Sequence, residues 1–169
     1  MRAVKVSLVL AVLVATPMFA QTATSNLDVS ATVVANCTIA TTPVAFGAYD
    51  PIAANSGAAA HLDSTGTVDV ACTKGTPGLR IDLGTGANAG GALSTTRAMT
   101  AGAGLFLDYD LYSDNGHTTL WGSGAGSGVT LTAPANKNVR STTVYGRVPG
   151  AQDVSAGSYN DTVVATINF

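Results

Sequence analysis

Glutamate is absent from this 169-residue chain, lysine is scarce and there is one tryptophan. Only 11% of the residues are charged, and eight Lys and Arg stand against ten acidic residues, all of them Asp. Such a balance lacks the cationic surface with which proteins bind nucleic acid or anionic lipid, so we expect neither partner. The shortage of Glu, Lys and Leu-rich windows also removes the usual helix formers, whereas abundant Gly, Ala, Thr, Ser and Asn favours an extracellular β protein.

Residues that could carry chemistry are few. His61 and His117 are the only histidines, and both lie near expected loops without the close spacing of metal ligands. Asp108 and Asp110 share one strand face, where a carboxylate pair could act in glycoside hydrolysis, but their alternation with apolar residues favours the solvent face of a sheet. Gly84–Ala89 matches a dinucleotide fingerprint only formally, because no helix is expected after it. The sequence therefore predicts a protein that is not an enzyme, with no cofactor and no metal.

A single long apolar run, Val6–Ala15, follows Arg2 and Lys5. The run has about ten residues, whereas a membrane-spanning helix needs roughly 20. Residues 1–20 are therefore predicted to be a signal peptide, cleaved before Gln21, and no second run of spanning length follows. We expect an exported chain without a membrane span, in which six basic residues remain against ten Asp.

The sequence holds two cysteines, Cys37 and Cys72, both in the exported part. In an oxidising compartment the simplest interpretation is one structural disulfide. A loop of about 35 residues would be closed, which stabilises the fold by roughly 3.8 kcal/mol in the chain-entropy model. A free reactive thiol is the alternative, but neither cysteine has a neighbouring base in the sequence.

Short stretches of alternating apolar and polar residues, separated by Gly, Pro and Asn, dominate the rest of the chain. This pattern predicts β-strands, and after residue 20 no window of a dozen residues has a helical period. The expected strands cover residues 27–33, 68–72, 79–83, 105–111, 117–121, 129–131, 142–148 and 163–169. Asn-Gly within Ser113–Gly116 favours a type I′ hairpin turn. We expect an all-β, antiparallel two-sheet sandwich.

The last of these strands ends on Phe169, with Val163, Ala165 and Ile167 on the same face. Chain ends usually fray, so we expect a strand at this position to have a partner, in the same chain or in another.

The order of short motifs resembles the spore coat protein U family, the subunits of archaic (Csu-type) chaperone–usher pili. The resemblance covers essentially the whole exported chain. Its landmarks are Val34–Ile39, Val44–Tyr49, Val68–Cys72, Thr96–Met99, Leu107–Tyr112, Trp121–Gly122, Val144–Pro149 and Gly157–Val163. Each landmark is weak alone, but their order and spacing are specific.

The resemblance implies an immunoglobulin-like sandwich that lacks its last strand, with a groove open for a donor strand. A periplasmic chaperone would fill the groove first, and at an outer-membrane usher the N-terminal strand of a neighbouring subunit would replace it. Residues 21–36 would form the donor segment and 37–169 the domain. The groove-filling residues would be Leu27, Val29, Ala31 and Val33, and the acceptor edge Val163, Ala165, Ile167 and Phe169, whose carboxylate the chaperone would hold.

Three alternatives stay open at this point. The segment at residues 27–33 could be an ordinary first strand of its own domain. A secreted adhesin could use Trp121, Tyr109 and Tyr112 as stacking rings for a carbohydrate or a surface, and an exported hydrolase rests only on the carboxylate pair. The function that we expect is a surface pilus or coat subunit that polymerises by donor-strand exchange and supports adhesion and biofilm formation. Pilus and coat are not distinguished, nor is the position of the subunit or the donor register.

Overall fold

A computed structural model describes residues 20–88, 97–102 and 104–169. The predicted signal peptide therefore lies almost wholly outside the described residues and stays a prediction. The chain divides into two units, Met1–Thr32 and Val33–Phe169. In the first unit, the described residues 20–32 are exposed and form no strand.

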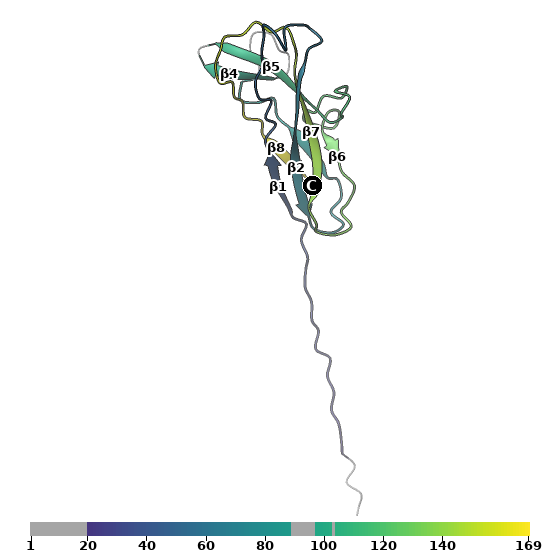
Figure 1. Ribbon diagram of the computed structural model, residues 1–169. Coiled ribbons are helices and arrows are strands. Elements are labelled where there is room, and N and C mark those ends of the chain that lie inside the picture. The colour runs from purple at the N-terminus through teal and green to yellow at the C-terminus, as the bar shows by residue number, and fades with distance from the viewer. Residues whose placement is uncertain (1–19, 89–96, 103) are drawn as a thin grey trace, which may run out of the picture. The chain divides into compact units, whose positions relative to one another are not determined.

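The described residues of the second unit form eight strands in two antiparallel sheets (Figure 1). A five-stranded sheet has the order β1-β2-β7-β5-β4, and a three-stranded sheet has the order β6-β3-β8. The strands are β1 (Cys37–Thr42), β2 (Leu62–Cys72), β3 (Arg80–Leu83), β4 (Arg97–Gly102), β5 (Leu105–Tyr112), β6 (Val129–Thr130), β7 (Arg140–Val148) and β8 (Ala165–Asn168). The all-β, antiparallel prediction is confirmed, and no described residue is helical.

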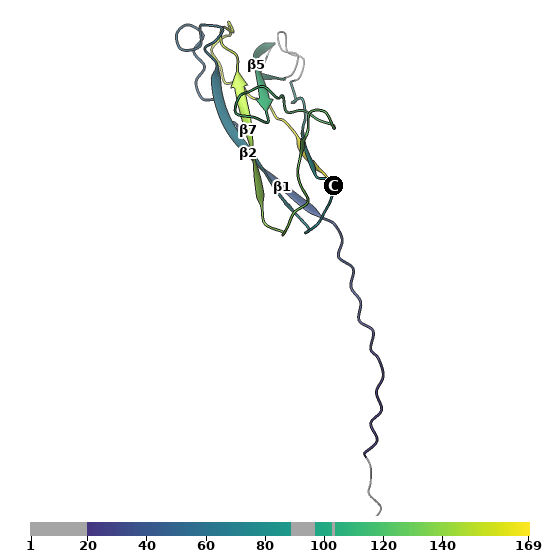
Figure 2. The ribbon, with the colours of Figure 1, turned by 90° about the vertical axis from the view of Figure 1, so that its right-hand side faces the viewer.

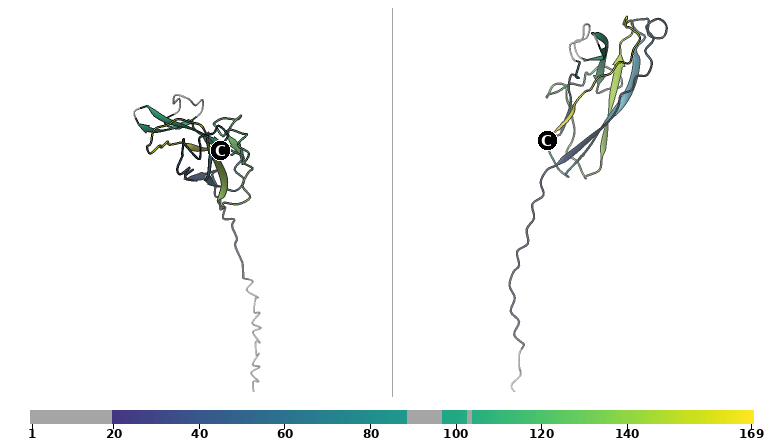
Figure 3. Two further views of the ribbon diagram at one scale, coloured as in Figure 1. Left: turned by 45° about the horizontal axis from the view of Figure 1, so that its top comes forward. Right: turned by 90° about the vertical axis from the view of Figure 1, so that its left-hand side faces the viewer.

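The two longest strands, β2 and β7, run side by side along the unit (Figures 2 and 3). Their register runs from the pair Leu62–Val148 at one end to the pair Val70–Arg140 at the other. Alternate residues of β2 are buried, as the sequence pattern requires of a strand with one face against a core.

Trp121 is a fully buried residue of the core. Its indole Nε1 donates a hydrogen bond to the carbonyl oxygen of Ile81 at 3.0 Å, which satisfies the only polar atom of the ring. The other fully buried large side chains are Leu79, Ile81, Val68, Val70 and Val148.

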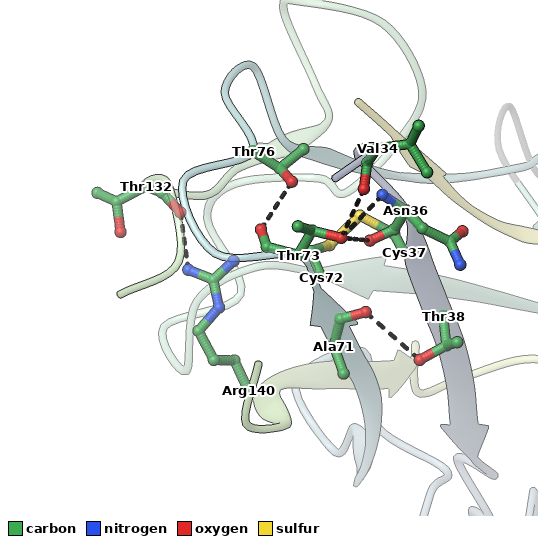
Figure 4. Close-up of a disulfide and its surroundings, with 10 residues drawn as sticks. All are labelled: Val34, Asn36, Cys37, Thr38, Ala71, Cys72, Thr73, Thr76, Thr132 and Arg140. Atoms are coloured by element: carbon green, nitrogen blue, oxygen red, sulfur yellow. Dashed lines mark hydrogen bonds between the residues drawn. A yellow bond between two sulfur atoms is a disulfide. The ribbon is translucent and has the colours of Figure 1, made fainter. Parts of the chain in front are cut away.

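The predicted disulfide is confirmed (Figure 4). Cys37, the first residue of β1, pairs with Cys72, the last residue of β2, so the bond ties the two strands at one end of their ladder.

The turn after β5 differs from the predicted type I′ hairpin. In this turn the positive φ falls on His117, at 54°, and neither Asn115 nor Gly116 has one. Asp114 explains the difference, because its carboxylate accepts hydrogen bonds from the amides of Thr118 and Thr119 and so shapes a wider turn. The expected return strand at residues 117–121 is reduced to one bridge, between Tyr112 and Leu120.

Three further segments differ from the prediction. β1 was not among the expected strands, because the first strand was placed at residues 27–33. β4 was not expected, because its sequence, RAMTAG, lacks a regular alternation. Residues 27–33 alternate well but form no strand, so the alternative of an ordinary first strand is wrong for this structure. No helix in the described ranges could cross a membrane.

Candidate functional site

An apolar groove opens between the two sheets of the second unit. Its volume is about 1240 Å³, and its floor is made by inward-facing residues of β2, β5 and β7. These floor residues are Val68, Leu107, Tyr109, Leu111, Val144 and Val148, all at most 5% exposed. The groove therefore reaches down into the core of the sandwich.

One wall of the groove is the stretch of chain that follows β1. Here Val44 and Phe46 lie over β7, and the Phe46 ring meets the Tyr109 ring edge-on at 6.0 Å. The close approach depends on Gly146, since a Cβ at this position would come within 2.6 Å of Val44 and 2.8 Å of Phe46. The glycine in the Val144–Pro149 landmark is thus explained by packing.

The opposite wall is the stretch from Val154 to Ala165, which leads into β8. Thr100 and Asn160 exchange two backbone hydrogen bonds, of 2.9 and 3.0 Å, which hold this wall against β4. β8 pairs with β3 on one side only, and no described strand pairs with its other edge. β1 likewise pairs only with β2, so two free strand edges flank the groove.

The groove is bounded at one end by the approach of β1 to β8. From β1 only Thr41 and Thr42 line it, and from β8 only Ala165. At the other end the lining continues to Ile52 and Ser155, in the connections beyond the ends of the strands. A strand that occupied the groove would therefore point its tip toward the β1–β8 end and leave by the other end.

A polar network fixes the wall beside β8. The Tyr109 hydroxyl donates to Asp161 Oδ2 at 2.6 Å, and Asp161 Oδ1 accepts from the amide of Ala87 at 2.9 Å. Burial raises the pKa of Tyr109, and the bond to Asp161 raises it further, so the phenol stays a donor at neutral pH. The network joins the wall to β5 and to the chain after β3.

Buried Arg97 supports the same region from β4. Its guanidinium donates to the carbonyl oxygens of Gly84 at 2.8 Å and Trp121 at 2.7 Å. Burial lowers the pKa of Arg97. Both contacts go to the backbone, so this arginine organises the fold around the groove.

The structure places the predicted acceptor residues in two groups. Val163 and Ala165 line the groove, whereas Ile167 packs against the core and Phe169 is 56% exposed. Their role as an acceptor edge stays a prediction.

The predicted donor residues are strongly exposed. Leu27, Val29 and Val33 are 87%, 88% and 83% exposed, and Ala31 is exposed as well. Because these four apolar side chains are exposed to solvent, they do not stabilise their own fold, and their function is still to be explained.

Two of the three aromatic rings on which the adhesin alternative rested are buried and so cannot stack on a ligand. Trp121 is fully buried and Tyr109 is only 5% exposed, because both rings fill the core. Tyr112 is partly buried and meets the His117 ring edge-on at 5.2 Å. The adhesin reading loses the residues on which it rested.

The position of Asp108, one of the two carboxylates of the hydrolase alternative, also differs from the predicted solvent face. Asp108 is only 9% exposed and not on a solvent face, because Gln152 covers it with hydrogen bonds to its amide and carbonyl at 2.8 and 3.0 Å. Burial raises the pKa of Asp108. No group of three or more His, Cys, Asp or Glu in the described ranges is placed to hold a metal ion.

Sequence reasoning missed one wall of the groove and one contact outside the groove. The wall from Val44 to Tyr49 was seen only as a landmark, although its alternation of Val44, Phe46 and Ala48 could have indicated a groove-facing stretch. Thr73 was missed altogether: its hydroxyl accepts from the Asn36 amide at 3.1 Å and donates to the Val34 carbonyl oxygen at 3.2 Å (Figure 4). No sequence signal marks such a contact, because Thr73 lies 37 residues beyond Asn36.

Two sheets, a disulfide between β1 and β2, and a groove between two free edges define an immunoglobulin-like sandwich with one strand position unfilled.

The chain belongs to the spore coat protein U family, since the model of the Spore Coat Protein U domain matches residues 23–166. It is 37% identical over 166 residues to "Protein U" of Myxococcus xanthus, an alignment that covers 90% of this chain and 88% of the relative. The resemblance seen in the sequence is thereby confirmed.

A solved structure shares the fold. The chaperone–tip adhesion subunit pre-assembly complex CsuC–CsuE, from the archaic chaperone–usher Csu pili of Acinetobacter baumannii, matches with a TM-score of 0.56 and 23% identity. The match covers 82% of this chain and 41% of the chain in that complex. At this identity the likeness is one of fold.

Proposed function

We propose that this protein is a structural subunit that polymerises by donor-strand exchange into a surface filament or coat. The observation that carries the proposal is the pairing of an unfilled apolar groove with an exposed alternating segment, residues 27–33, in one chain. A groove flanked by two unpaired strand edges can accept an added strand, and an exposed segment with the alternation of a strand can supply it. A head-to-tail contact that does not close on itself produces a filament.

The groove and the segment match in size and chemistry. Residues 21–33, fully extended, would span about 43 Å, which exceeds the ~33 Å that ten extended residues span, the number in the lining stretch Thr41–Asp50. Burying Leu27, Val29 and Val33 would contribute several kcal/mol, at about 1.5–3 kcal/mol for each side chain. Backbone hydrogen bonds to the free edge of β8 would add to this.

The closed end of the groove also sets a direction. A donor that leaves by the end near Ile52 has its tip at the β1–β8 end, and would run antiparallel to β8. Antiparallel addition forms the hydrogen-bond pattern already present between β8 and β3.

Before polymerisation, the same groove requires another cover, because an open edge beside an apolar cavity promotes aggregation. A periplasmic chaperone that lends a strand, followed by exchange at an outer-membrane usher, meets this need. The subunit would then pass through the periplasm to the cell surface, where the polymer would support adhesion and biofilm formation. The solved relative of the same fold, in a chaperone–subunit complex of a pilus system, supports this route.

The test compares two substitutions in the donor segment. Val29→Asp places a charge where an apolar side chain would enter the groove, whereas Ser30→Asp places the same charge on the opposite face of the strand. The Val29→Asp chain should form no SDS-resistant, heat-labile multimers, and the Ser30→Asp chain should form them like the unchanged protein. Both chains should unfold at the same temperature as monomers, because neither residue has a role in the domain.

Deletion of residues 21–33 is the stronger version of the test. The deletion stops before Val34, because Thr73 binds Val34 and Asn36 and a longer deletion would remove part of the domain. Multimers that persist in this chain, or in the Val29→Asp chain, would rule out donor-strand exchange through this segment.

A further inference from the structure

The second unit has two poles, defined by the ends of the β2–β7 pair. The exit pole contains the connections 73–78 and 132–139, joined by a hydrogen bond of 2.9 Å from the Gly75 amide to the Pro134 carbonyl oxygen. The groove pole contains the connections 49–61 and 149–153, joined by a bond of 2.7 Å from the Ala151 amide to the Asn55 carbonyl oxygen. The groove opens toward the groove pole.

The N-terminal segment is held at the exit pole up to Val34. Besides the two side-chain contacts of Thr73, the Thr73 amide donates to the Asn36 carbonyl oxygen at 2.8 Å, directly beside the disulfide (Figure 4). Only Val33 and the residues before it can therefore leave the domain without breaking contacts.

This attachment brings the poles of neighbouring subunits together, if donor-strand exchange occurs as proposed above. Val33, the last donor residue, is three residues from the fixed Asn36, and three extended residues span about 10 Å. A donor that leaves its acceptor groove at the groove pole therefore holds the two poles within about one Debye length at 0.1 M salt.

The two poles carry opposite charges. Lys74 and Lys137 are exposed at the exit pole, and neither forms an ion pair with any described residue. Asp50 and Asp153 are exposed at the groove pole and likewise have no ion pair within the described part of the chain. The turn amides of Ala53 and Ile52 lower the pKa of Asp50, so this carboxylate is ionised at neutral pH.

Each pole also exposes a branched apolar side chain. Val139 is 64% exposed at the exit pole, and Ile52 is 89% exposed at the groove pole. Contact between the poles would remove both side chains from water while it brings Lys and Asp together.

We propose that the exit pole of one copy docks on the groove pole of the next copy, with Lys74 and Lys137 facing Asp50 and Asp153. The occupant of each pole is thus a second copy of this chain. The contact is additional to the donor strand: it steers the approach of the two subunits and sets the angle between them, since exposed charges act mainly on association rate and orientation.

The test is a charge swap within one chain. Lys137→Asp and Asp153→Lys are made separately and together, because in a homopolymer the double variant restores opposite charges across every contact. Asp153 is preferred to Asp50, which also accepts hydrogen bonds from the amides of Ile52 and Ala53. The readout is the initial rate at which the full chain forms the SDS-resistant ladder, at about 0.01 M and about 1 M NaCl.

At low salt each single variant should assemble about threefold to tenfold more slowly than the unchanged chain, and the double variant should regain most of the rate. At about 1 M NaCl the four chains should assemble alike, because the Debye length falls to about 3 Å. Single variants that assemble at the normal rate at low salt, or a double variant slower than both singles, would overturn the pole contact.

The deletion of residues 21–33 keeps the two proposals apart. If the deleted chain forms no ladder and the charge variants behave like the unchanged chain, strand exchange stands and the pole contact fails. If the deleted chain still forms a ladder whose rate follows the charge swap, the poles interact and strand exchange fails.

Discussion

Two stretches of this chain share one pattern and differ in their structure. Residues 27–33 alternate apolar and polar side chains over seven positions, and residues 163–169 do so except at Val164. In the second stretch Ala165–Asn168 forms β8, paired with β3, and Ile167 packs against the core. In the first, Leu27, Val29 and Val33 are more than 80% exposed and no strand forms.

This difference shows that two questions are separate: whether a strand needs a partner, and which molecule supplies the partner. Alternation predicts that one face of a strand will be buried, but the burying surface can belong to another molecule. β8 pairs with β3 along one edge, and no described strand pairs with its other edge, which lies beside the groove. Strand exchange, as proposed, would pair the N-terminal stretch of one copy with this free edge of another.

The largest effect on the free energy of unfolding is expected at the disulfide, near the point where the unpaired N-terminal stretch joins the folded domain. Replacing Cys37 and Cys72 together by Ala should lower the free energy of unfolding by roughly 3.8 kcal/mol, through loss of loop closure in the unfolded chain. Chemical denaturation of the monomer, reduced and oxidised, measures this. A double variant as stable as the oxidised protein would show that the disulfide does not stabilise the folded domain.

A direct comparison of the two stretches should give the next largest effect. Ile167→Ala should cost about 2 kcal/mol of monomer stability, because the side chain packs against the core. Val29→Ala should change monomer stability by less than about 0.5 kcal/mol, since the side chain is 88% exposed. Urea unfolding of both monomers measures the contrast, and equal losses would contradict the distinction between the two stretches.

A smaller effect is expected at Asp108, which lies on the outer side of β5, away from both stretches. Its Oδ1 is buried without a hydrogen-bond partner among the described residues, so Asp108→Asn should stabilise the monomer by about 1 kcal/mol at neutral pH. The pKa of Asp108 is raised in the folded state, so folding takes up protons there. The penalty is therefore present at neutral pH and is relieved as the pH falls through the folded-state pKa.

Measurement of stability against pH for both proteins checks this sign. The gain from Asp108→Asn should shrink toward pH 4, which is near the ordinary pKa of an aspartate. A gain that grows on acidification would contradict the assigned burial.

The sequence was sufficient for the β class, the disulfide and most strands, because these depend on local alternation and on the compartment inferred for the two cysteines. β4 could not be predicted, since it is held by pairing with β5 and not by its own pattern. The turn at Asp114 was mistaken because a side chain competed with the Asn-Gly preference. Likewise, burial of Trp121 and Asp108 depends on chain segments distant in sequence, which a single alternating pattern does not reveal.

The groove was expected only through the family resemblance. Of the four predicted acceptor residues, Val163 and Ala165 line the groove and Ile167 and Phe169 do not, and the role of all four as an acceptor edge stays a prediction. Alternation could not show where the lining ends along β8, because the point where β8 meets β1 depends on how two distant segments pack.

Hydrogen exchange at the backbone amides of residues 21–33 shows directly whether this segment becomes a strand in a neighbouring copy. We expect these amides to exchange without protection in the monomer and about a thousandfold more slowly in the polymer, where they become part of a sheet in the next copy. The protection should be missing in the Val29→Asp chain and present in the Ser30→Asp chain. A polymer in which these amides exchange as fast as in the monomer would exclude donor-strand exchange through residues 21–33.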